Sequence, residues 1–129
     1  MERVVSNFFK MVFLALFACS SGLAFSATNS TFEAYCKICH DKSMAAMFGA
    51  PAAHDMLAWD LRKADAFGRA VSKNGSIKNS IGNDKYEHII NELLLTAKEG
   101  TPKGMPPRGT CIDCSDDELR AAIRFISSE

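Results

Sequence analysis

The segment YCKICHDK (residues 35–42) constrains this chain more than any other stretch, because two thiols stand close together and an imidazole directly follows the second. Three chemistries use such a group: a redox dithiol, one half of a zinc site, and covalent attachment of haem. On a helix, Cys36 and Cys39 lie about one turn apart, so both can reach the two haem vinyl groups from one side. The adjacent His40 then turns its ring onto the iron from that same side. The C-x-x-C-H pattern therefore predicts c-type haem attachment through Cys36 and Cys39, with His40 as an axial ligand.

The other two chemistries fit the sequence less well. In a thioredoxin-like dithiol the histidine has no required role, and the expected βαβ context is missing. A zinc site would need the second C-x-x-C pair, Cys111 and Cys114, which follows Cys39 at a distance far beyond the roughly 15 to 20 residues of compact zinc modules. Ser115 stands where a second haem would require histidine, so one haem is expected. Cys111 and Cys114 can instead form a disulfide in an oxidising compartment.

The N-terminus has the order of regions found in secretory signal peptides. Arg3 and Lys10 precede the apolar run MVFLALFA (11–18), and small residues follow through Ala27. The apolar run is well short of the ~20 residues that span a bilayer, so membrane insertion is not expected. The sequence therefore predicts export.

Two cleavage sites compete. Small residues in AFS (24–26) predict cleavage that leaves 27–129 as the mature chain, so residues 1–26 are interpreted as the signal peptide. The alternative is LFAC (16–19), which resembles a lipoprotein box and would tether the protein through a lipid on Cys19. The first interpretation is preferred because a phenylalanine before the small residue is unusual in a lipoprotein box.

The remaining composition suits one small globular domain. Acidic and basic residues number 15 each in the whole chain, and 47% of residues are hydrophobic. Removing Arg3, Lys10 and Glu2 with the leader leaves a formal net charge of −1, which indicates neither a nucleic-acid nor a membrane-surface partner. A domain of this size has a modest core, so a cofactor or crosslink would stabilise it considerably.

The chain after the leader is predicted to be all-α, because no stretch alternates like a strand. Ser30 followed by Glu33 is a capping-box pattern and predicts a helix that carries the C-x-x-C-H motif near its end. Three more helices are expected from apolar residues at helical spacing: 54–72 (Leu57, Leu61, Ala64, Val71), 85–100 (Tyr86, Ile89, Ile90, Leu93, Leu94, Ala97) and 115 to the C-terminus (Leu119, Ala122, Ile123, Ile126).

A haem iron in an electron carrier needs a second axial ligand from a distant segment. The candidates after the leader are Met44, Met47, Met56, Met105, His54 and His88. Met105 is preferred because Pro106 and the proline after it stiffen the loop PKGMPPRG (102–109) and can present the sulfur at a fixed position. The other methionines are interpreted as core residues. The two histidines would be ligands only if Met105 were found away from the iron, which would give a bis-histidine haem of lower potential.

Four segments resemble the class I c-type cytochromes, most closely the small bacterial cytochrome c5 group. They are CKICH (36–40), GAPAAHD leading to AWDLR (58–62), GMPPRG (104–109) and TCIDCSDDELRAAIRFI (110–126). The resemblance implies a single-haem class I cytochrome c fold, His40 and Met105 as axial ligands, and a short disulfide between Cys111 and Cys114. It also implies that Trp59 and Arg62, at the W-x-x-R positions, contact the haem propionates. Indole and guanidinium N–H groups are suitable donors to carboxylates.

The resemblance further implies an electron carrier rather than an enzyme. The expected protein is a periplasmic monohaem cytochrome that moves single electrons in a bacterial respiratory chain, with a terminal oxidase, a reductase or a quinol-cytochrome c oxidoreductase as partner. Residues 63–85 exceed the typical family length and are expected to form an extra helix or loop at the surface. A haem sensor, or a haem enzyme subunit with a labile distal ligand, is the alternative, followed by a zinc-binding cysteine protein.

Overall fold

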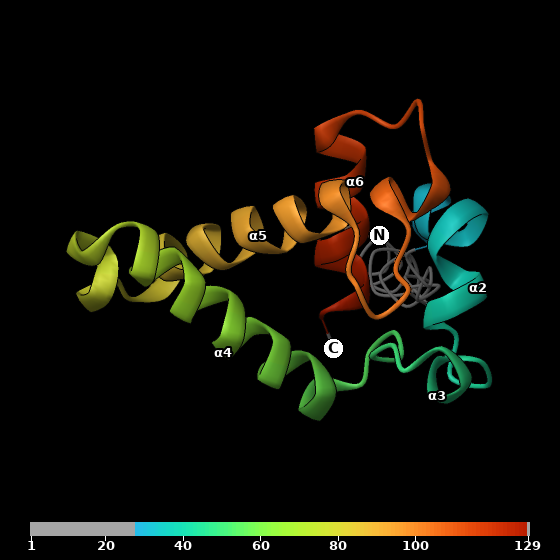
Figure 1. Cartoon of the computed structure of the whole chain (residues 1–129), viewed down its shortest axis with the longest axis horizontal. Coiled ribbons are helices and arrows are strands. Elements are labelled where there is room, and N and C mark those ends of the chain that lie inside the picture. Colours follow the sequence, from blue (N-terminus) through green and yellow to red (C-terminus); the bar gives the residue numbers. More distant parts are fainter. Residues whose placement is uncertain (1–27, 129) are drawn as a thin grey trace, which may run out of the picture.

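Helices account for all regular secondary structure in residues 28–128, the part of the chain that this computed structural model describes (Figure 1). The order is η1 (Phe32–Cys36, a π-helix), α2 (Lys37–His40), α3 (Ala45–Phe48), α4 (Met56–Lys73), η2 (Gly75–Asn79, a 3-10 helix), α5 (Gly82–Glu99), η3 (Pro107–Thr110) and α6 (Asp116–Ile126). The all-α prediction is confirmed. The expected signal peptide and Cys19 lie outside the described residues.

The helix that carries the C-x-x-C-H motif begins where expected, but with a different cap. The side chain of Asn29, not of Ser30, accepts a hydrogen bond from the backbone N–H of Phe32 at 2.9 Å. Glu33 does not reach back to form a capping box. It accepts instead from Lys37 Nζ at 2.7 Å, one turn further on. The capping-box prediction is wrong here because an Asn one position earlier supplies an equally good acceptor.

Helix α4 is where the predicted apolar face differs most from the observed one. The helix starts after Asp55, whose carboxylate accepts from the backbone N–H of Ala58 at 3.1 Å. Its buried residues are Trp59, Ala66 and Ala70. The side chains of Leu57 and Leu61 are instead 77% and 68% exposed. The leucine pattern correctly predicted a helix, but it marks the solvent side of that helix.

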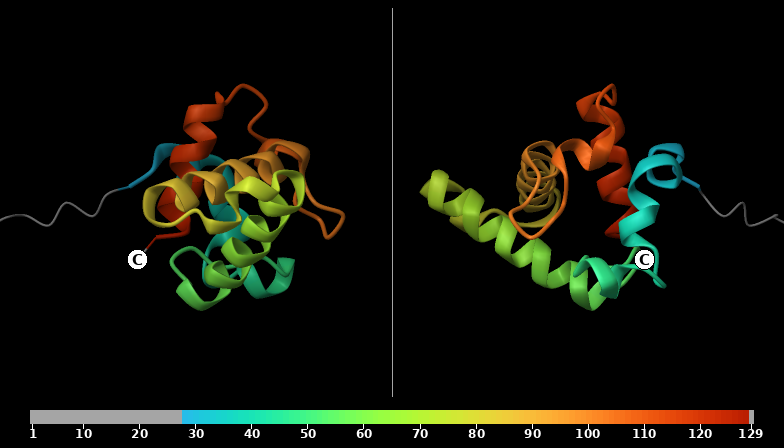
Figure 2. Two further views of the ribbon diagram at one scale, coloured as in Figure 1. Left: turned by 90° about the vertical axis from the view of Figure 1, so that its left-hand side faces the viewer. Right: turned by 45° about the vertical axis from the view of Figure 1, so that its right-hand side comes forward.

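Residues 63–85 form the second part of α4, all of η2 and the start of α5, which together make a helical hairpin. Figures 1 and 2 show α4 and α5 meeting at η2 and diverging toward the rest of the molecule. The buried carboxylate of Glu92 links the two helices, because it accepts two bonds from Lys73 Nζ at 2.8 and 2.9 Å. Arg69 Nε lies 3.8 Å from the same carboxylate.

The C-terminal helix α6 follows the sequence prediction closely. Ser115 Oγ accepts from the backbone N–H of Glu118, and the Glu118 carboxylate accepts from the backbone N–H of Ser115, so the predicted capping box is present. The predicted apolar residues Leu119, Ala122, Ile123 and Ile126 are all buried. Within residues 28–128, no helix combines the length and the apolar character that crossing a membrane requires.

The buried side chains form two separate clusters. The larger one joins α4, α5 and α6 with the segment before α6 (Ala66, Ile89, Ile90, Leu93, Leu94, Ala97, Cys111, Cys114, Leu119, Ile123). The smaller one joins η1, the start of α4 and the end of α6 (Phe32, Ala53, Trp59, Ile126). This division positions the site, because residues of both clusters line one cavity between them.

Candidate cofactor site

A cavity of about 430 Å³ lies between α2, α4, the end of α5, the loop 101–110 and α6. This volume is in the range of cofactor and ligand pockets, which are mostly apolar with a few placed polar groups. The apolar wall residues are Tyr35, Ile38, Phe48, Ala50, Pro51, Leu93, Ala97, Pro102, Pro106, Leu119, Ala122, Ile123 and Ile126.

Both thiols of the C-x-x-C-H motif lie on the wall of this cavity. Cys36 and Cys39 are half-buried and not disulfide-bonded. Burial raises the pKa of the Cys36 thiol, and the neighbouring Cys39 raises it further. They come from the end of η1 and from α2, so the helix presents them to the cavity about one turn apart.

His40 is buried, and its ring orientation is fixed by the backbone. The Nδ1–H donates to the carbonyl oxygen of Pro51 at 2.7 Å, which leaves the Nε2 lone pair as the free acceptor of the ring. Burial lowers the pKa of His40 and outweighs the hydrogen bond to Pro51, which acts in the opposite direction. The Trp59 ring stacks against the imidazole with centroids 5.8 Å apart. A neutral imidazole held through Nδ1 is the usual arrangement of a metal-ligating histidine.

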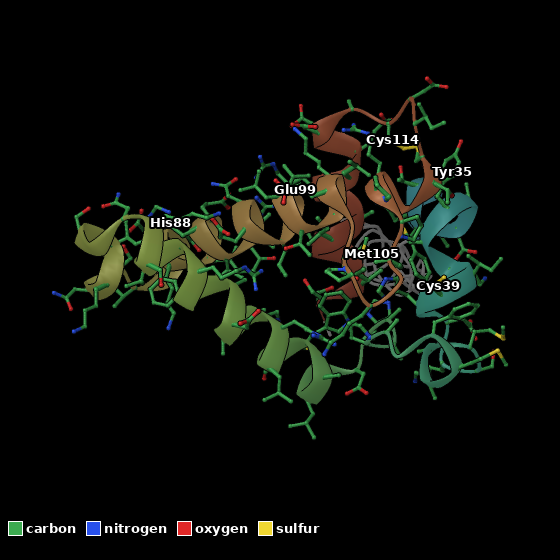
Figure 3. All side chains as sticks on the ribbon, in the orientation of Figure 1. Tyr35, Cys39, His88, Glu99, Met105 and Cys114 are labelled. Atoms are coloured by element: carbon green, nitrogen blue, oxygen red, sulfur yellow. A yellow bond between two sulfur atoms is a disulfide. The ribbon has the colours of Figure 1, made fainter. Side chains whose placement is uncertain are left out.

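Met105 is half-buried and lines the same cavity from the loop before α6. Figure 3 shows Cys39 on the α2 side and Met105 on the loop side. Thr101 holds the methionine backbone twice: its N–H donates to Met105 O at 2.8 Å, and its hydroxyl accepts from Met105 N–H at 3.2 Å. Gly100 adjoins this loop so closely that an added Cβ would lie 2.6 Å from Met105 O. The position of Met105 therefore depends on the end of α5.

Arg108 is a residue of this site that the sequence reasoning missed. Its Nη2–H donates to the carbonyl oxygen of Cys114 and lies 3.7 Å from Asp116, so the side chain ties the methionine loop to the start of α6. Its Nε–H is buried and has no acceptor in residues 28–128, although Arg108 lines the cavity. The signal was available in the motif MPPRG, where a cation stands three residues after the proposed ligand methionine.

Cys111 and Cys114 are joined by a disulfide, with their Cα atoms 5.5 Å apart. Both are buried in the larger core cluster, next to the loop that carries Met105. They are consequently not available to a zinc site. Within residues 28–128, no group of three or more His, Cys, Asp or Glu side chains is placed to hold a metal ion.

Trp59 and Arg62 both line the cavity, but their donors differ in availability. The indole N–H of Trp59 donates to the carbonyl oxygen of Ala52 at 2.7 Å and is therefore already paired. Arg62 is exposed at the cavity rim and has no such fixed partner among the described residues. A propionate contact remains a prediction for both residues, with the stronger geometric support at Arg62.

The other candidate axial ligands lie elsewhere. None of Met44, Met47, Met56, His54 and His88 lines the cavity. Met47 is 74% exposed on the short helix α3, so its interpretation as a core residue is wrong. The His54 ring is hydrogen-bonded to the carbonyl oxygen of Ser128 at 2.7 Å, and His88 lies 3.6 Å from Asp84 on α5. Of the candidates, the described structure brings only His40 and Met105 to the same cavity.

The donor set fits a covalently attached haem. Two free thiols, an imidazole with a free Nε2, and a thioether share one largely apolar cavity. The buried Nε–H of Arg108 lacks an acceptor, which a haem propionate would provide. Each chemical group that such a cofactor requires is thus present on the cavity wall.

Comparisons with known proteins found a matching family model and curated relatives. A family model described as "Cytochrome C oxidase, cbb3-type, subunit III" matches residues 24–126. Cytochrome c5 of Ectopseudomonas mendocina is 34% identical over 110 residues, which cover 85% of this chain and 98% of the relative. Cytochrome c5 of Azotobacter vinelandii is 38% identical over 93 residues, covering 72% and 82%. No solved structure gave a significant match.

Proposed function

Because this chain belongs to the cytochrome c5-like class I c-type cytochromes, electron carriers that bind haem covalently, we propose that it carries single electrons within a bacterial respiratory chain. The iron would be held between His40 and Met105. The observation that carries this proposal is the convergence of both thiols, the fixed imidazole and the methionine on one cavity. Redox proteins are the partners of such a carrier, and we propose a terminal oxidase, a reductase or a quinol-cytochrome c oxidoreductase.

The residues of the chain have distinct tasks. Cys36 and Cys39 would hold haem c through thioether bonds, and the bound haem supplies the one-electron ferric–ferrous couple. The carbonyl of Pro51 keeps His40 in the tautomer that leaves Nε2 for the iron. Thr101 fixes Met105 from the other side of the cavity. A methionine ligand raises the reduction potential relative to a second histidine.

The surroundings of the site would limit reorganisation and set the potential. Apolar side chains from α2, α5 and α6 exclude water, which favours the less charged ferrous state. Arg62 and Arg108 would supply guanidinium N–H donors for the two propionates, since among residues 28–128 the first has no fixed partner and the Nε–H of the second has no acceptor. No acid–base pair would be required of the protein, because single-electron transfer would break no bond to His40 or Met105.

Export and cleavage complete the proposal. Residues 1–26 would act as the signal peptide, and residues 27–129 would form the mature cytochrome domain in the periplasm, with 63–85 as an insertion. Haem attachment and the Cys111–Cys114 disulfide both suit an oxidising compartment. Lipid attachment at Cys19 would instead tether the same domain, and the mass of the mature protein distinguishes the two.

An optical spectrum of the purified exported protein, oxidised and reduced, tests the proposed ligation. We expect sharp reduced c-type bands, together with the weak long-wavelength band of ferric methionine-ligated haem. Met105→Leu should abolish that weak band, whereas Met47→Leu, at an exposed position away from the cavity, should preserve it. A wild-type spectrum without the band, combined with ready carbon monoxide binding, would favour the sensor or enzyme alternative. Absence of any haem absorption would refute the proposal.

A further inference from the structure

The imidazole ring of His40 has a flat aromatic neighbour on one face. The indole ring of Trp59 stacks against it, with centroids 5.8 Å apart and planes inclined by 27°. The torsion that turns a histidine ring about its Cβ–Cγ bond has broad minima, so rotamer preference alone does not fix the plane of the ring. The hydrogen bond from Nδ1–H to the carbonyl oxygen of Pro51 restrains one atom of the imidazole. A ring held at one atom can still tilt about that atom, and the indole face limits this tilt.

Trp59 is itself held firmly. Its side chain is 6% exposed and belongs to the smaller core cluster. The indole N–H donates to the carbonyl oxygen of Ala52 at 2.7 Å, and the backbone N–H donates to the carbonyl oxygen of Asp55 at 2.9 Å. A large buried ring that is hydrogen-bonded at its edge has little freedom to rotate. The indole can therefore act as a fixed surface against which His40 rests.

The backbone of residues 51–53 connects the two rings. Consecutive carbonyls of this segment serve one ring each, because Pro51 accepts from His40 and Ala52 accepts from Trp59. The N–H of Ala53 donates back to the carbonyl oxygen of His40 at 2.6 Å. The pyrrolidine ring of Pro51 further restricts the backbone here. His40, Trp59 and this segment thus form one connected frame around the imidazole.

We propose that Trp59 is a positioning residue for His40, and that its indole face sets the plane of the imidazole when this ring ligates the haem iron. The inference rests on the function proposed above, in which His40 is an axial ligand. It gives Trp59 a task at the ligand instead of a contact with a haem propionate, because the indole N–H is already paired with Ala52. The plane of an axial histidine determines how its π electrons overlap with the iron d orbitals. A fixed plane therefore limits the rearrangement that accompanies electron transfer.

Core packing alone would not require a flat ring on this side of His40. Phe32 is similarly buried, at 5% exposed, in the same cluster. Its ring packs against Phe125, with centroids 5.3 Å apart, and it does not line the cavity. Trp59, in contrast, lines the cavity and contacts the His40 ring. A comparison of the two aromatic residues therefore separates the loss of core packing from the loss of ring orientation.

Proton NMR of the ferric haem-loaded protein tests the proposal, because the paramagnetic shifts of the haem methyl groups depend on the orientation of the axial histidine plane. Trp59→Leu should change the order or the spread of these shifts, whereas the matched control Phe32→Leu should retain the wild-type pattern. Both variants should have lower melting temperatures than the wild type, because each removes part of a buried aromatic ring. An unchanged shift pattern in Trp59→Leu overturns the proposal, as does the same change in Phe32→Leu.

A second variant tests the aromatic face apart from the indole N–H. Trp59→Phe keeps a flat ring but has no donor for the carbonyl oxygen of Ala52. If the face of the ring orients His40, the methyl shifts should stay closer to the wild-type pattern in Trp59→Phe than in Trp59→Leu. Equal changes in both variants would assign the effect to the N–H and contradict the proposal.

The wild-type protein distinguishes a failure of this inference from a failure of the proposed function. A wild-type spectrum without reduced c-type bands would overturn both, because His40 would then ligate no haem. With those bands and the weak long-wavelength methionine band present in the wild type, an unchanged shift pattern in Trp59→Leu refutes the role of Trp59 alone.

Discussion

Gly100→Ala is predicted to displace Met105 while leaving the helices formed. Gly100 follows α5 with φ 77° and ψ −173°, a backbone region that essentially only glycine occupies. An alanine Cβ there would lie 2.6 Å from Met105 O, 2.9 Å from Pro107 N and 3.1 Å from the Pro106 carbonyl carbon. All three atoms belong to backbone, so no side-chain rotation relieves the contact.

The cost can be estimated from two contributions. The strained backbone conformation contributes about 1 to 3 kcal/mol, and forcing atoms into a closely packed contact contributes about 1 to 3 kcal/mol more. Their sum is a large part of the 5 to 15 kcal/mol by which a typical domain is stable. The loop around Met105 is held by a few bonds from Thr101, whereas α5 is anchored by its buried face. The loop should therefore give way before the helix.

Two measurements on the haem-loaded protein check this expectation. The long-wavelength ferric methionine band should be lost or strongly weakened, and urea unfolding followed by circular dichroism should show at least about 2 kcal/mol of lost stability. Gly104→Ala is the matched control. Gly104 also has a positive φ, 114°, in the same loop, but an added Cβ there meets nothing within 4 Å. If Gly100→Ala keeps the band and costs no more than Gly104→Ala, the close contact does not position Met105.

Three further predictions concern the elements around the site. Ser115→Ala should lower the melting temperature at neutral pH, corresponding to about 1 kcal/mol for a lost N-cap. Hydrogen bonds from the backbone N–H and the hydroxyl of Ser115 lower the pKa of Glu118. These bonds therefore stabilise the folded protein at pH values above the ordinary pKa of a glutamate, and the stabilisation is lost as the pH falls through the pKa of Glu118 in the folded protein. The difference between the wild type and Ser115→Ala in thermal melts should thus shrink from pH 7 to pH 3, and a constant difference would contradict the linkage. The Cys111–Cys114 disulfide closes only a short loop. Its reduction should therefore lower the free energy of unfolding in urea by only about 2 kcal/mol and leave the haem attached. Thr101→Val should retain the helices in circular dichroism but accelerate carbon monoxide binding to the ferrous haem, because the hydroxyl no longer anchors the ligand methionine; an unchanged rate would show that the backbone bond suffices.

Local signals predicted the helices well where the deciding interaction was itself local. The capping box at Ser115 is an interaction within four residues, and it forms as predicted. At Ser30 the same pattern was wrong, because the side chain of Asn29 caps the helix one residue earlier, through the backbone N–H of Phe32. For α4, periodicity showed a helix but could not show which of two apolar faces meets the domain. That choice depends on α5, whose buried side chains form one core cluster with Ala66 of α4.

The sequence predicted the residues that would bind the cofactor better than the groups that hold those residues in place. Covalent and coordinate bonds demand particular atoms, so the C-x-x-C-H motif and the Met-Pro-Pro loop could be identified from residue types alone. The groups that orient the side chains are backbone carbonyls, which any residue could supply. The carbonyl of Pro51 accepts a hydrogen bond from His40, and the carbonyl of Ala52 accepts one from Trp59. Likewise, the unpaired Nε–H of Arg108 becomes visible only when its burial is known.

The two core clusters imply that the cofactor completes the fold as well as performing the chemistry. The cavity of about 430 Å³ lies between them, and without the cofactor its mostly apolar wall would face water, which makes the packing of the two clusters against each other less favourable. In a Cys36→Ala, Cys39→Ala variant, which has no thiols for haem attachment, the smaller cluster should therefore open while the larger one persists. Amide hydrogen exchange should show retained protection around Ile90 in α5 and lost protection around Phe32 in η1, since the first belongs to the ten-residue cluster and the second to the four-residue cluster. Loss of protection in both regions together would mean that the domain is a single cooperative unit that needs haem everywhere, and unchanged protection in both would mean that the protein alone closes the cavity.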